Sequence, residues 1–274
     1  MPYLERDDAV QLYYEVHGKG KPLILTHGYS STSAMWQGQI DSFTKAGYQL
    51  IIWDMCGHGK SSYPRDQLLY SEAHTVADIA ALLDHVYGAG SPAVVGGLSL
   101  GGYMSLAFYR VHPERVRALL VIDTGPGFKS DKAREVWNQT ALKTASRFEK
   151  EGLSALQADG VSPERSLVSH RNASGLARAA RGMLAQQNAA VIESLPQVKV
   201  PALVVVGGED KPFLTASEYM ATRIPGAKKV VVPGAGHAAN IDQPEAFNEA
   251  VLGFLARAEV SSSRGGGSGS KALL

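Results

Sequence analysis

The chain has 274 residues, with 27 Lys and Arg against 26 Asp and Glu, so its formal net charge is +1. Since there is no basic surplus to neutralise a run of phosphates, we expect no nucleic-acid binding. The single cysteine, Cys56, excludes an intramolecular disulfide and any paired-cysteine metal or redox site. No stretch reaches the roughly 18 apolar residues of a membrane span, so we expect no membrane association and a soluble, cytoplasmic monomer or homodimer that acts on a small molecule.

Short apolar runs predict strands along most of the chain. Several of them are apolar throughout, which is typical of strands buried on both faces of a parallel sheet. Helical periodicity separates them, first over 75–87, where Thr75 to Asp78 indicates a capping box, and last from Pro244 onward. The alternation favours an α/β fold with a mostly parallel sheet. The runs cover residues 11–17, 22–26, 49–53, 93–95, 119–122, 202–206 and 229–232.

One segment, residues 125–200, interrupts this alternation. It contains no convincing buried strand, and residues 133–150 and 163–195 look helical. We interpret it as a helical cap, or lid, inserted into the core; the alternative is a packing subdomain that only stabilises the sheet edge. The predicted division is therefore core at 1–124, cap at 125–200, core at 201–258 and a flexible Gly/Ser-rich tail at 259–274.

A serine stands between glycines where one predicted strand meets a helix. Gly97 to Gly101 reads G-L-S-L-G and matches G-x-S-x-G directly after the run at 93–95. Such a strand–turn–helix projects the serine hydroxyl above the carboxyl ends of the strands, where the helix N-terminus favours developing negative charge. Ser99 is therefore the candidate nucleophile; the alternative is a glycine-rich turn with an ordinary serine.

A nucleophilic serine needs a base, and the base needs an orienting carboxylate. His237 follows a predicted strand and a glycine loop, so it should lie on the same sheet rim as Ser99; the alternative is a histidine that caps the last helix. Asp210, at the end of the run 202–206, is the candidate acid. Asp123, at the end of an earlier run, and Glu209 stay open as alternatives.

The remaining site features follow from backbone and apolar residues. Backbone N–H groups of Tyr29 and Leu100 are the candidate oxyanion hole, and His27 would tie the first of these loops by hydrogen bonds. No metal-ligand spacing is found, so we expect neither metal nor cofactor. Apolar and aromatic residues near the rim predict the substrate pocket: Tyr29, Met35, Trp36, Leu98, Phe128, Trp137 and Phe213.

Together these motifs resemble the α/β-hydrolase superfamily over about residues 12–255. The motifs, in chain order, are His27-Gly28, Asp54 to Ser61, Gly97 to Gly101, Gly207 to Asp210, and Gly236-His237. The second is similar to the superfamily's D-x-R-G-H-G-x-S loop, with Cys56 in place of the arginine. The resemblance implies an α/β-hydrolase fold: a mostly parallel eight-stranded sheet flanked by helices, with a helical cap inserted after the sixth strand.

Within the superfamily, the loop at 236–248 is similar to that of 3-oxoadipate enol-lactonases and small carboxylesterases. This implies a serine hydrolase that cleaves a small, mainly apolar carboxylic ester or lactone through an acyl-enzyme on Ser99. A C–C bond hydrolase and a cofactor-free perhydrolase (haloperoxidase) remain as alternatives. A non-catalytic, ligand-binding member of the fold is a further one.

Overall fold

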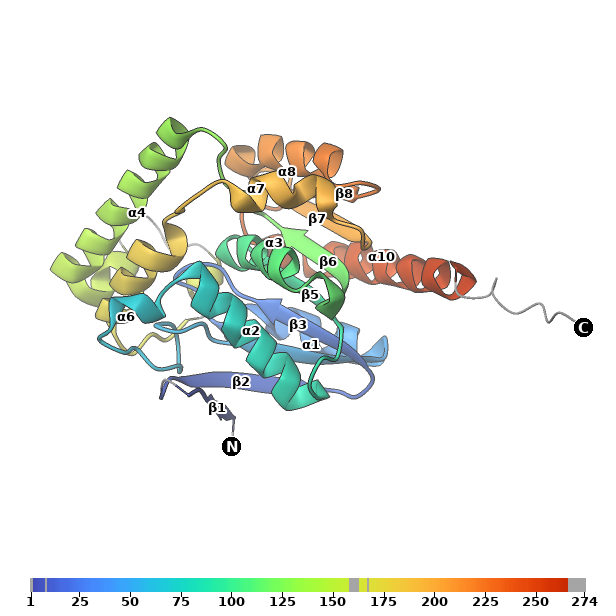
Figure 1. Cartoon of the computed structure of the whole chain (residues 1–274), viewed down its shortest axis with the longest axis horizontal. Helices are drawn as coiled ribbons and strands as arrows, with labels where there is room; N and C mark the ends of the chain where they lie inside the picture. Colours follow the sequence, from blue (N-terminus) through green and yellow to red (C-terminus); the bar gives the residue numbers. More distant parts are fainter. Residues whose placement is uncertain (1, 8, 158–162, 167, 266–274) are drawn as a thin grey trace, which may run out of the picture.

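One eight-stranded sheet organises the protein (Figure 1). The computed structural model describes residues 2–7, 9–157, 163–166 and 168–265. The strand order is β1-β2-β4-β3-β5-β6-β7-β8; β2 pairs antiparallel with β1 and β4, and all other pairs are parallel. The mostly parallel eight-stranded sheet expected from the sequence is thus confirmed. The strands are β1 Tyr3–Glu5, β2 Gln11–His17, β3 Lys21–Thr26, β4 Tyr48–Trp53, β5 Ala93–Leu98, β6 Val116–Ile122, β7 Ala202–Gly207 and β8 Lys228–Val232.

The strand that the apolar runs do not reveal is β1. It has three residues, lies at the sheet edge and pairs only with β2, with Tyr3 opposite Tyr13. The rings of these two tyrosines meet edge to face with centroids 5.5 Å apart. An edge strand that exposes most of its surface needs no apolar run, so it leaves little periodic signal.

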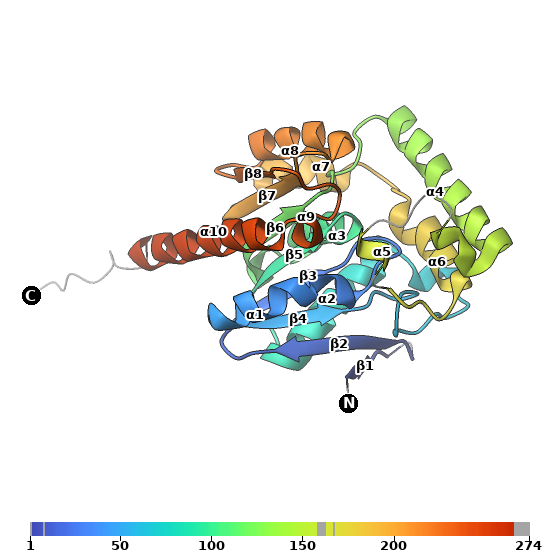
Figure 2. The ribbon, with the colours of Figure 1, turned by 180° about the vertical axis from the view of Figure 1, so that it is seen from behind.

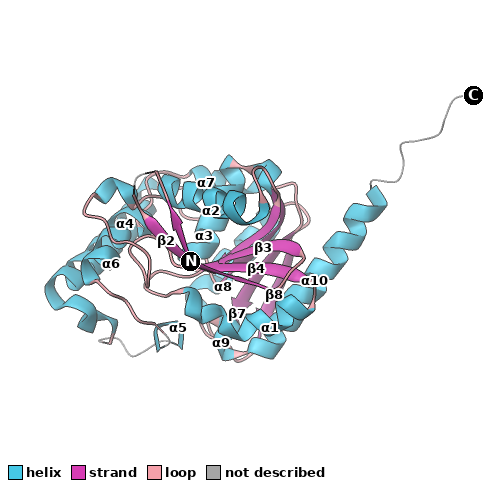
Figure 3. Ribbon diagram, turned by 90° about the horizontal axis from the view of Figure 1, so that it is seen from below, coloured by secondary structure: helices cyan, strands magenta, loops and turns pink. Residues whose placement is uncertain are grey.

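Helices cover both faces of the sheet (Figure 3). Alternation along β3 shows how: Ile24 packs into a core with α2, α3, α7 and α8, whereas Leu23 and Leu25 pack into a second core with α1, α9 and α10. The helices are α1 Gln37–Lys45, α2 Glu72–Tyr87, α3 Leu100–Val111, α4 Asp131–Glu151, α5 Pro163–Ser166, α6 Ala173–Ala179, α7 Ala190–Ser194, α8 Lys211–Arg223, α9 Ala239–Asp242 and α10 Pro244–Gly265.

The start of α2 differs from the prediction of a capping box at Thr75 to Asp78. The helix begins at Glu72, and the Ser71 side chain caps it by accepting a hydrogen bond from the His74 N–H. The Thr75 hydroxyl instead donates to the Ser71 carbonyl, one turn back. An apolar stripe locates a helix better than its first turn, because the first turn has no need to face the core.

Between β6 and β7 the chain forms α4 to α7, of which α4 and α6 share an apolar core of their own. Phe148 of α4 and Leu176 of α6 belong to this cluster, and Figures 1 and 2 show both helices beyond one end of the sheet. The predicted helix at 133–150 is present as α4. The stretch 163–195 is broken into short helices instead, because Asn172 caps a new helix and the Gln186 N–H bonds to the Asn138 side chain.

The last helix, α10, runs further than the sequence indicates. Its Glu259 accepts hydrogen bonds from the Lys21 ammonium group at 2.5 Å and from the Tyr48 hydroxyl at 2.8 Å, which hold this part of the helix against the sheet. Residues 259–265, expected in the flexible tail, are therefore helical. The rest of the predicted tail, 266–274, lies outside the described residues.

Candidate active site

Ser99 lies on a strained turn between β5 and α3. Its φ of 55° is rare for a residue with a side chain. The turn is compact because Gly97 and Gly101 touch: a Cβ on Gly97 would lie 2.5 Å from the Gly101 carbonyl carbon. The Ser99 carbonyl accepts hydrogen bonds from the Thr124 hydroxyl at 2.7 Å and the Tyr103 N–H at 3.0 Å. These contacts fix the backbone at the position where the sequence predicted the nucleophile.

The loop after β3 lies beside Ser99, since a Cβ on Gly28 would sit 3.3 Å from the Ser99 Cβ. His27 holds this loop in place. Its Nδ1 donates to the Gly28 carbonyl at 2.7 Å, and its Nε2 accepts from the Met55 N–H at 3.0 Å. Burial lowers the pKa of His27 to about 4, in keeping with a neutral ring that both donates and accepts.

The predicted oxyanion donors come from this loop and from the start of α3. Leu100 is the first residue of α3, where backbone N–H groups have no acceptor within the helix. Tyr29 follows Gly28, and its hydroxyl donates to the Leu176 carbonyl at 2.9 Å, linking the loop to α6. Leu100 lines the same cavity as Ser99, whereas the Tyr29 side chain contacts the apolar cluster of α4 and α6.

His237 and Asp210 are hydrogen-bonded to each other. The distance between His237 Nδ1 and Asp210 Oδ2 is 2.8 Å. Because an ionised carboxylate only accepts, Nδ1 carries the proton, which leaves Nε2 as the basic nitrogen of the neutral ring. Burial lowers the pKa of His237, but the hydrogen bond and charge of Asp210 outweigh it, so the pKa lies above its ordinary value. The ring stacks on Phe213, with centroids 5.0 Å apart.

The two alternative acids have other surroundings. Asp123 is fully buried and accepts the Gly207 N–H at 2.7 Å and the Ala239 N–H at 3.2 Å. Burial raises the pKa of Asp123 to about 7. Glu209 is exposed to solvent. Of the three carboxylates that the sequence offered, Asp210 is the one bonded to His237.

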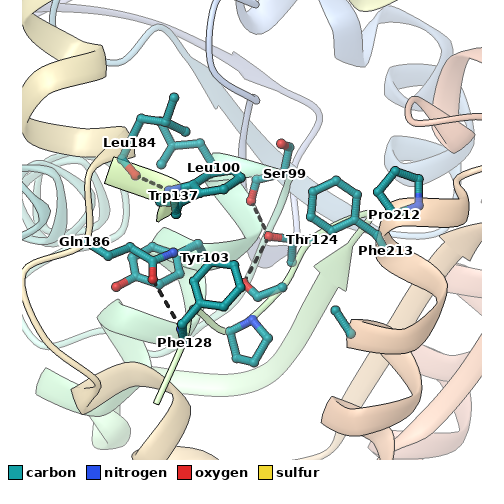
Figure 4. Close-up of a pocket in the computed structure, with 14 residues that line it drawn as sticks. Ser99, Leu100, Tyr103, Thr124, Phe128, Trp137, Leu184, Gln186, Pro212 and Phe213 are labelled. Carbon is teal, nitrogen blue, oxygen red and sulfur yellow. Dashed lines mark hydrogen bonds between the residues drawn. The ribbon is translucent and has the colours of Figure 1, made fainter. Parts of the chain in front are cut away.

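A cavity of about 230 Å³ opens beside Ser99 (Figure 4). Phe128, Trp137 and Phe213 line it, as the sequence predicted, and so does Leu100, which was predicted only as an oxyanion donor. Ser99 lies between Trp137 and Phe213 in this view. No lining residue carries a charge. The complete lining is Ser99, Leu100, Tyr103, Thr124, Gly125, Pro126, Gly127, Phe128, Trp137, Leu184, Gln186, Pro212, Phe213 and Ala216.

Trp36, Leu98 and Met35 were expected around the pocket but do not line this cavity. Each is buried in the core that the sheet forms with α1, α9 and α10. Leu98 directly precedes Ser99, and because strand side chains alternate between faces, it points into that core. Proximity in sequence to a rim residue therefore does not place a side chain on the rim.

Three polar residues of the cavity wall were not predicted from the sequence, namely Tyr103, Thr124 and Gln186. Thr124 had a usable signal, since it follows the carboxyl end of β6 and therefore lies on the rim. Gln186 had none, because it lies in an irregular segment between short helices.

The part of the chain that the structure describes contains neither a metal-ligand cluster nor a membrane-spanning helix. In those residues, no three His, Cys, Asp or Glu side chains gather as a metal site would require. Within the same ranges, no helix is both long enough and apolar enough to cross a bilayer.

Comparison with known proteins assigns the family. The profile described as "Alpha/beta hydrolase family" matches residues 23–250. The chain belongs to the alpha/beta hydrolase family. This confirms the superfamily expected from the five motifs and the α/β-hydrolase fold of its sheet and flanking helices.

Individual members of the family give the same picture. A pimeloyl-(acyl-carrier protein) methyl ester esterase from Aeromonas hydrophila is 28% identical, over 88% of this chain and 98% of its own. A thermophilic esterase from Thermogutta terrifontis aligns with a TM-score of 0.80 and 27% identity, over 93% of this chain and 98% of its own. The enol-lactonase from Burkholderia xenovorans LB400 aligns with a TM-score of 0.74 and 25% identity, over 93% of this chain and 100% of its own. The chain resembles esterases and enol-lactonases, and its family relatives support a hydrolase.

Proposed function

We propose that the protein hydrolyses small carboxylic esters or lactones through an acyl-enzyme on Ser99. The observation that carries the proposal is the hydrogen bond between His237 Nδ1 and Asp210 Oδ2, made on the rim that also bears Ser99. It leaves Nε2 as the basic nitrogen that takes the serine proton. The order Ser99, Asp210, His237 along the chain is the order of α/β-hydrolases.

In the proposed mechanism, Ser99 Oγ attacks the substrate carbonyl while His237 takes the serine proton. Asp210 holds the imidazole tautomer and stabilises the imidazolium that forms. The backbone N–H groups of Leu100 and Tyr29 stabilise the oxyanion of the tetrahedral intermediate. His237 then gives its proton to the leaving alcohol, and a water molecule, activated by the same imidazole, releases the acid from Ser99.

The cavity supports a small, mainly apolar substrate. Its volume of about 230 Å³ is below the range of drug-sized ligand pockets, about 300–1,000 Å³. Aromatic and aliphatic side chains form most of its wall, and the relatives include a methyl ester esterase and an enol-lactonase. A short ester or lactone therefore matches both the mainly apolar cavity wall and the kinds of enzyme found among the relatives.

The test is Ser99→Ala assayed against short p-nitrophenyl esters. We expect kcat to fall about 10⁴- to 10⁶-fold, because the acyl-enzyme can no longer form. Ser154→Ala, which changes an exposed serine of the segment between β6 and β7, is the matched control and should keep full activity. Labelling of the wild type, but not of Ser99→Ala, by a fluorophosphonate is the second readout. Unchanged turnover in Ser99→Ala would refute the proposal.

A further inference from the structure

Most polar side chains in the cavity wall donate their hydrogen atoms to the protein itself. The Thr124 hydroxyl donates to the Ser99 carbonyl, and the Tyr103 hydroxyl donates to Glu72 Oε2 at 2.9 Å. The Trp137 indole N–H donates to the Leu184 carbonyl at 2.8 Å. None of these three groups has a hydrogen left for a bound molecule. Apart from the Ser99 hydroxyl, the polar lining residue that remains is Gln186.

Hydrogen bonds to both the backbone and the side chain of Gln186 hold it in one orientation. Its backbone N–H donates to Asn138 Oδ1 at 2.8 Å, and its carbonyl accepts from Asn138 Nδ2 at 2.9 Å. Its side-chain Oε1 accepts the Phe128 N–H at 3.2 Å. Because that partner is a donor, the amide atom facing it must be the oxygen, so the Nε2 amide group faces the other way.

The Nε2 amide group of Gln186 has no hydrogen-bond acceptor among the residues that the structure describes. Gln186 is itself part of the cavity wall, and Figure 4 shows it reaching in beside Tyr103, with its oxygen turned to Phe128. The wall also contains Trp137, Leu184 and Phe128, and Tyr103, whose hydroxyl hydrogen is already donated to Glu72. Nε2 of Gln186 is not among the buried atoms that lack a partner, so its two N–H hydrogens still reach solvent. A ligand that displaces this solvent binds better if it brings an acceptor, because an unmet donor out of water is costly.

The location of Gln186 decides which part of the substrate it meets. The leaving alcohol must lie near His237, which stacks on Phe213. Figure 4 shows Phe213 on one side of Ser99 and Gln186, with Trp137, on the other. The group that extends from Ser99 toward Gln186 is therefore the acyl group.

We propose that Gln186 is a specificity-determining residue that selects acyl groups with an uncharged oxygen acceptor. The inference rests on the proposed ester hydrolysis at Ser99. The acceptor is a keto, ether or ester carbonyl oxygen, placed beyond the scissile carbonyl on a short chain that fits about 230 Å³. A carboxylate tail does not fit, because no lining residue carries a positive charge to pair with it, and burying an unpaired carboxylate is far costlier than burying a ketone.

The test uses matched pairs of p-nitrophenyl esters, in which one member has the oxygen and the other an isosteric carbon group. The pairs are methoxyacetate with butanoate, 4-oxopentanoate with 4-methylpentanoate, and 5-oxohexanoate with 5-methylhexanoate; the monoester of glutarate supplies a charged tail. Each kcat/KM is divided by the ester's own rate of alkaline hydrolysis. At the chain length that reaches Gln186, we expect the wild type to favour the oxygen-bearing ester about threefold to tenfold, the usual value of one uncharged hydrogen bond.

Two variants separate recognition from loop structure. Gln186→Leu removes the Nε2 donor and also the Oε1 atom that accepts the Phe128 N–H. It should abolish the preference for oxygen-bearing esters while the alkyl esters are still cleaved. Gln186→Glu keeps an oxygen for the Phe128 N–H but replaces the amide donor, and at pH 8.5 it should abolish or reverse the preference. Gln187→Leu, at the exposed neighbouring residue, should keep the wild-type preference.

The outcomes distinguish this inference from the function on which it rests. If the wild type cleaves both members of every pair equally well, or prefers the charged glutarate ester, the role of Gln186 is refuted and ester hydrolysis stands. If Gln186→Leu keeps the preference, another group recognises the oxygen, and the assignment is again wrong. If the wild type cleaves no ester and Ser99 is not labelled by a fluorophosphonate, the proposed function itself fails.

Discussion

The adjacent strands β6 and β7 each present a buried aspartate near the same histidine, and the two aspartates have different surroundings. Asp123, with a φ of 43°, lies just after β6 and accepts two backbone N–H groups, from Gly207 and from Ala239. Asp210 follows β7 and accepts from the His237 ring. Asp123 thereby joins the loops that carry Asp210 and His237, whereas Asp210 bonds to the imidazole itself. The donors around a carboxylate, rather than its position at a strand end, therefore decide what it can do.

The largest effect that separates the two aspartates is expected on turnover. Asp210→Asn should lower kcat about 10⁴-fold, because the amide favours the wrong imidazole tautomer and cannot stabilise the imidazolium. Glu209→Gln, at the exposed neighbour, is the matched control and should stay near wild-type activity. Steady-state kinetics on a short aryl ester make the measurement. If Asp123→Asn lowers kcat this far while Asp210→Asn is mild, the acid is Asp123.

Replacing Asp123 should instead lower the free energy of unfolding. Asp123→Ala leaves two buried backbone N–H groups without an acceptor, at about 1–3 kcal/mol each. It also places alanine at a positive φ, which aspartate and asparagine tolerate better. Urea unfolding measures the change, with Asp123→Asn as the control that retains one acceptor and the favourable backbone; its loss should be smaller. A free energy of unfolding unchanged in Asp123→Ala would refute the joining role.

The smallest effect is on pH dependence. The base must be unprotonated to accept the serine proton, so kcat/KM should rise with pH through the His237 pKa, which Asp210 keeps above its ordinary value of 6.5. The charge of Asp123 also raises this pKa. Asp123 carries its full charge only above its own pKa of about 7, so the effect is small. Asp123→Asn removes that charge, disfavours the imidazolium and should move the acid limb of the profile slightly to lower pH. A shift to higher pH, or a similar shift in Glu209→Gln, would contradict this.

Local motifs made much of the fold and site predictable. Ser99, Asp210 and His237 were found because each follows an apolar strand, and the carboxyl ends of neighbouring parallel strands share one rim. The structure brings His237 and Asp210 into contact, and it places Ser99 in the wall of the cavity. Their catalytic roles remain predictions for the experiments above. The glycines at 97 and 101 were a weak signal by themselves, and the strand before them and the helix after them made the prediction specific. In the structure only glycine permits their close approach.

Residue positions that depend on three-dimensional packing could not be predicted from local sequence motifs. Trp36 and Leu98 are apolar and close to motif residues, yet only the strand alternation and helix placement put them in the core behind the rim. Gln186 depends on Asn138, 48 residues away, for its orientation. The contact between Gln186 and Asn138 leaves no periodic trace in the sequence, because it joins distant parts of the chain.

The strand order also has a consequence for translation and for splitting the chain. Ser99 follows β5, which lies between β3 and β6 inside the sheet, whereas Asp210 and His237 follow β7 and β8 at one edge. If Ser99 is the nucleophile and His237 its base, the ribosome synthesises the nucleophile well over a hundred residues before the base. The growing chain therefore has no hydrolase activity until His237 has been added. If the gene were divided between β6 and β7, one fragment would carry Ser99 and the other Asp210 and His237. Ester hydrolysis would then require the two fragments to associate.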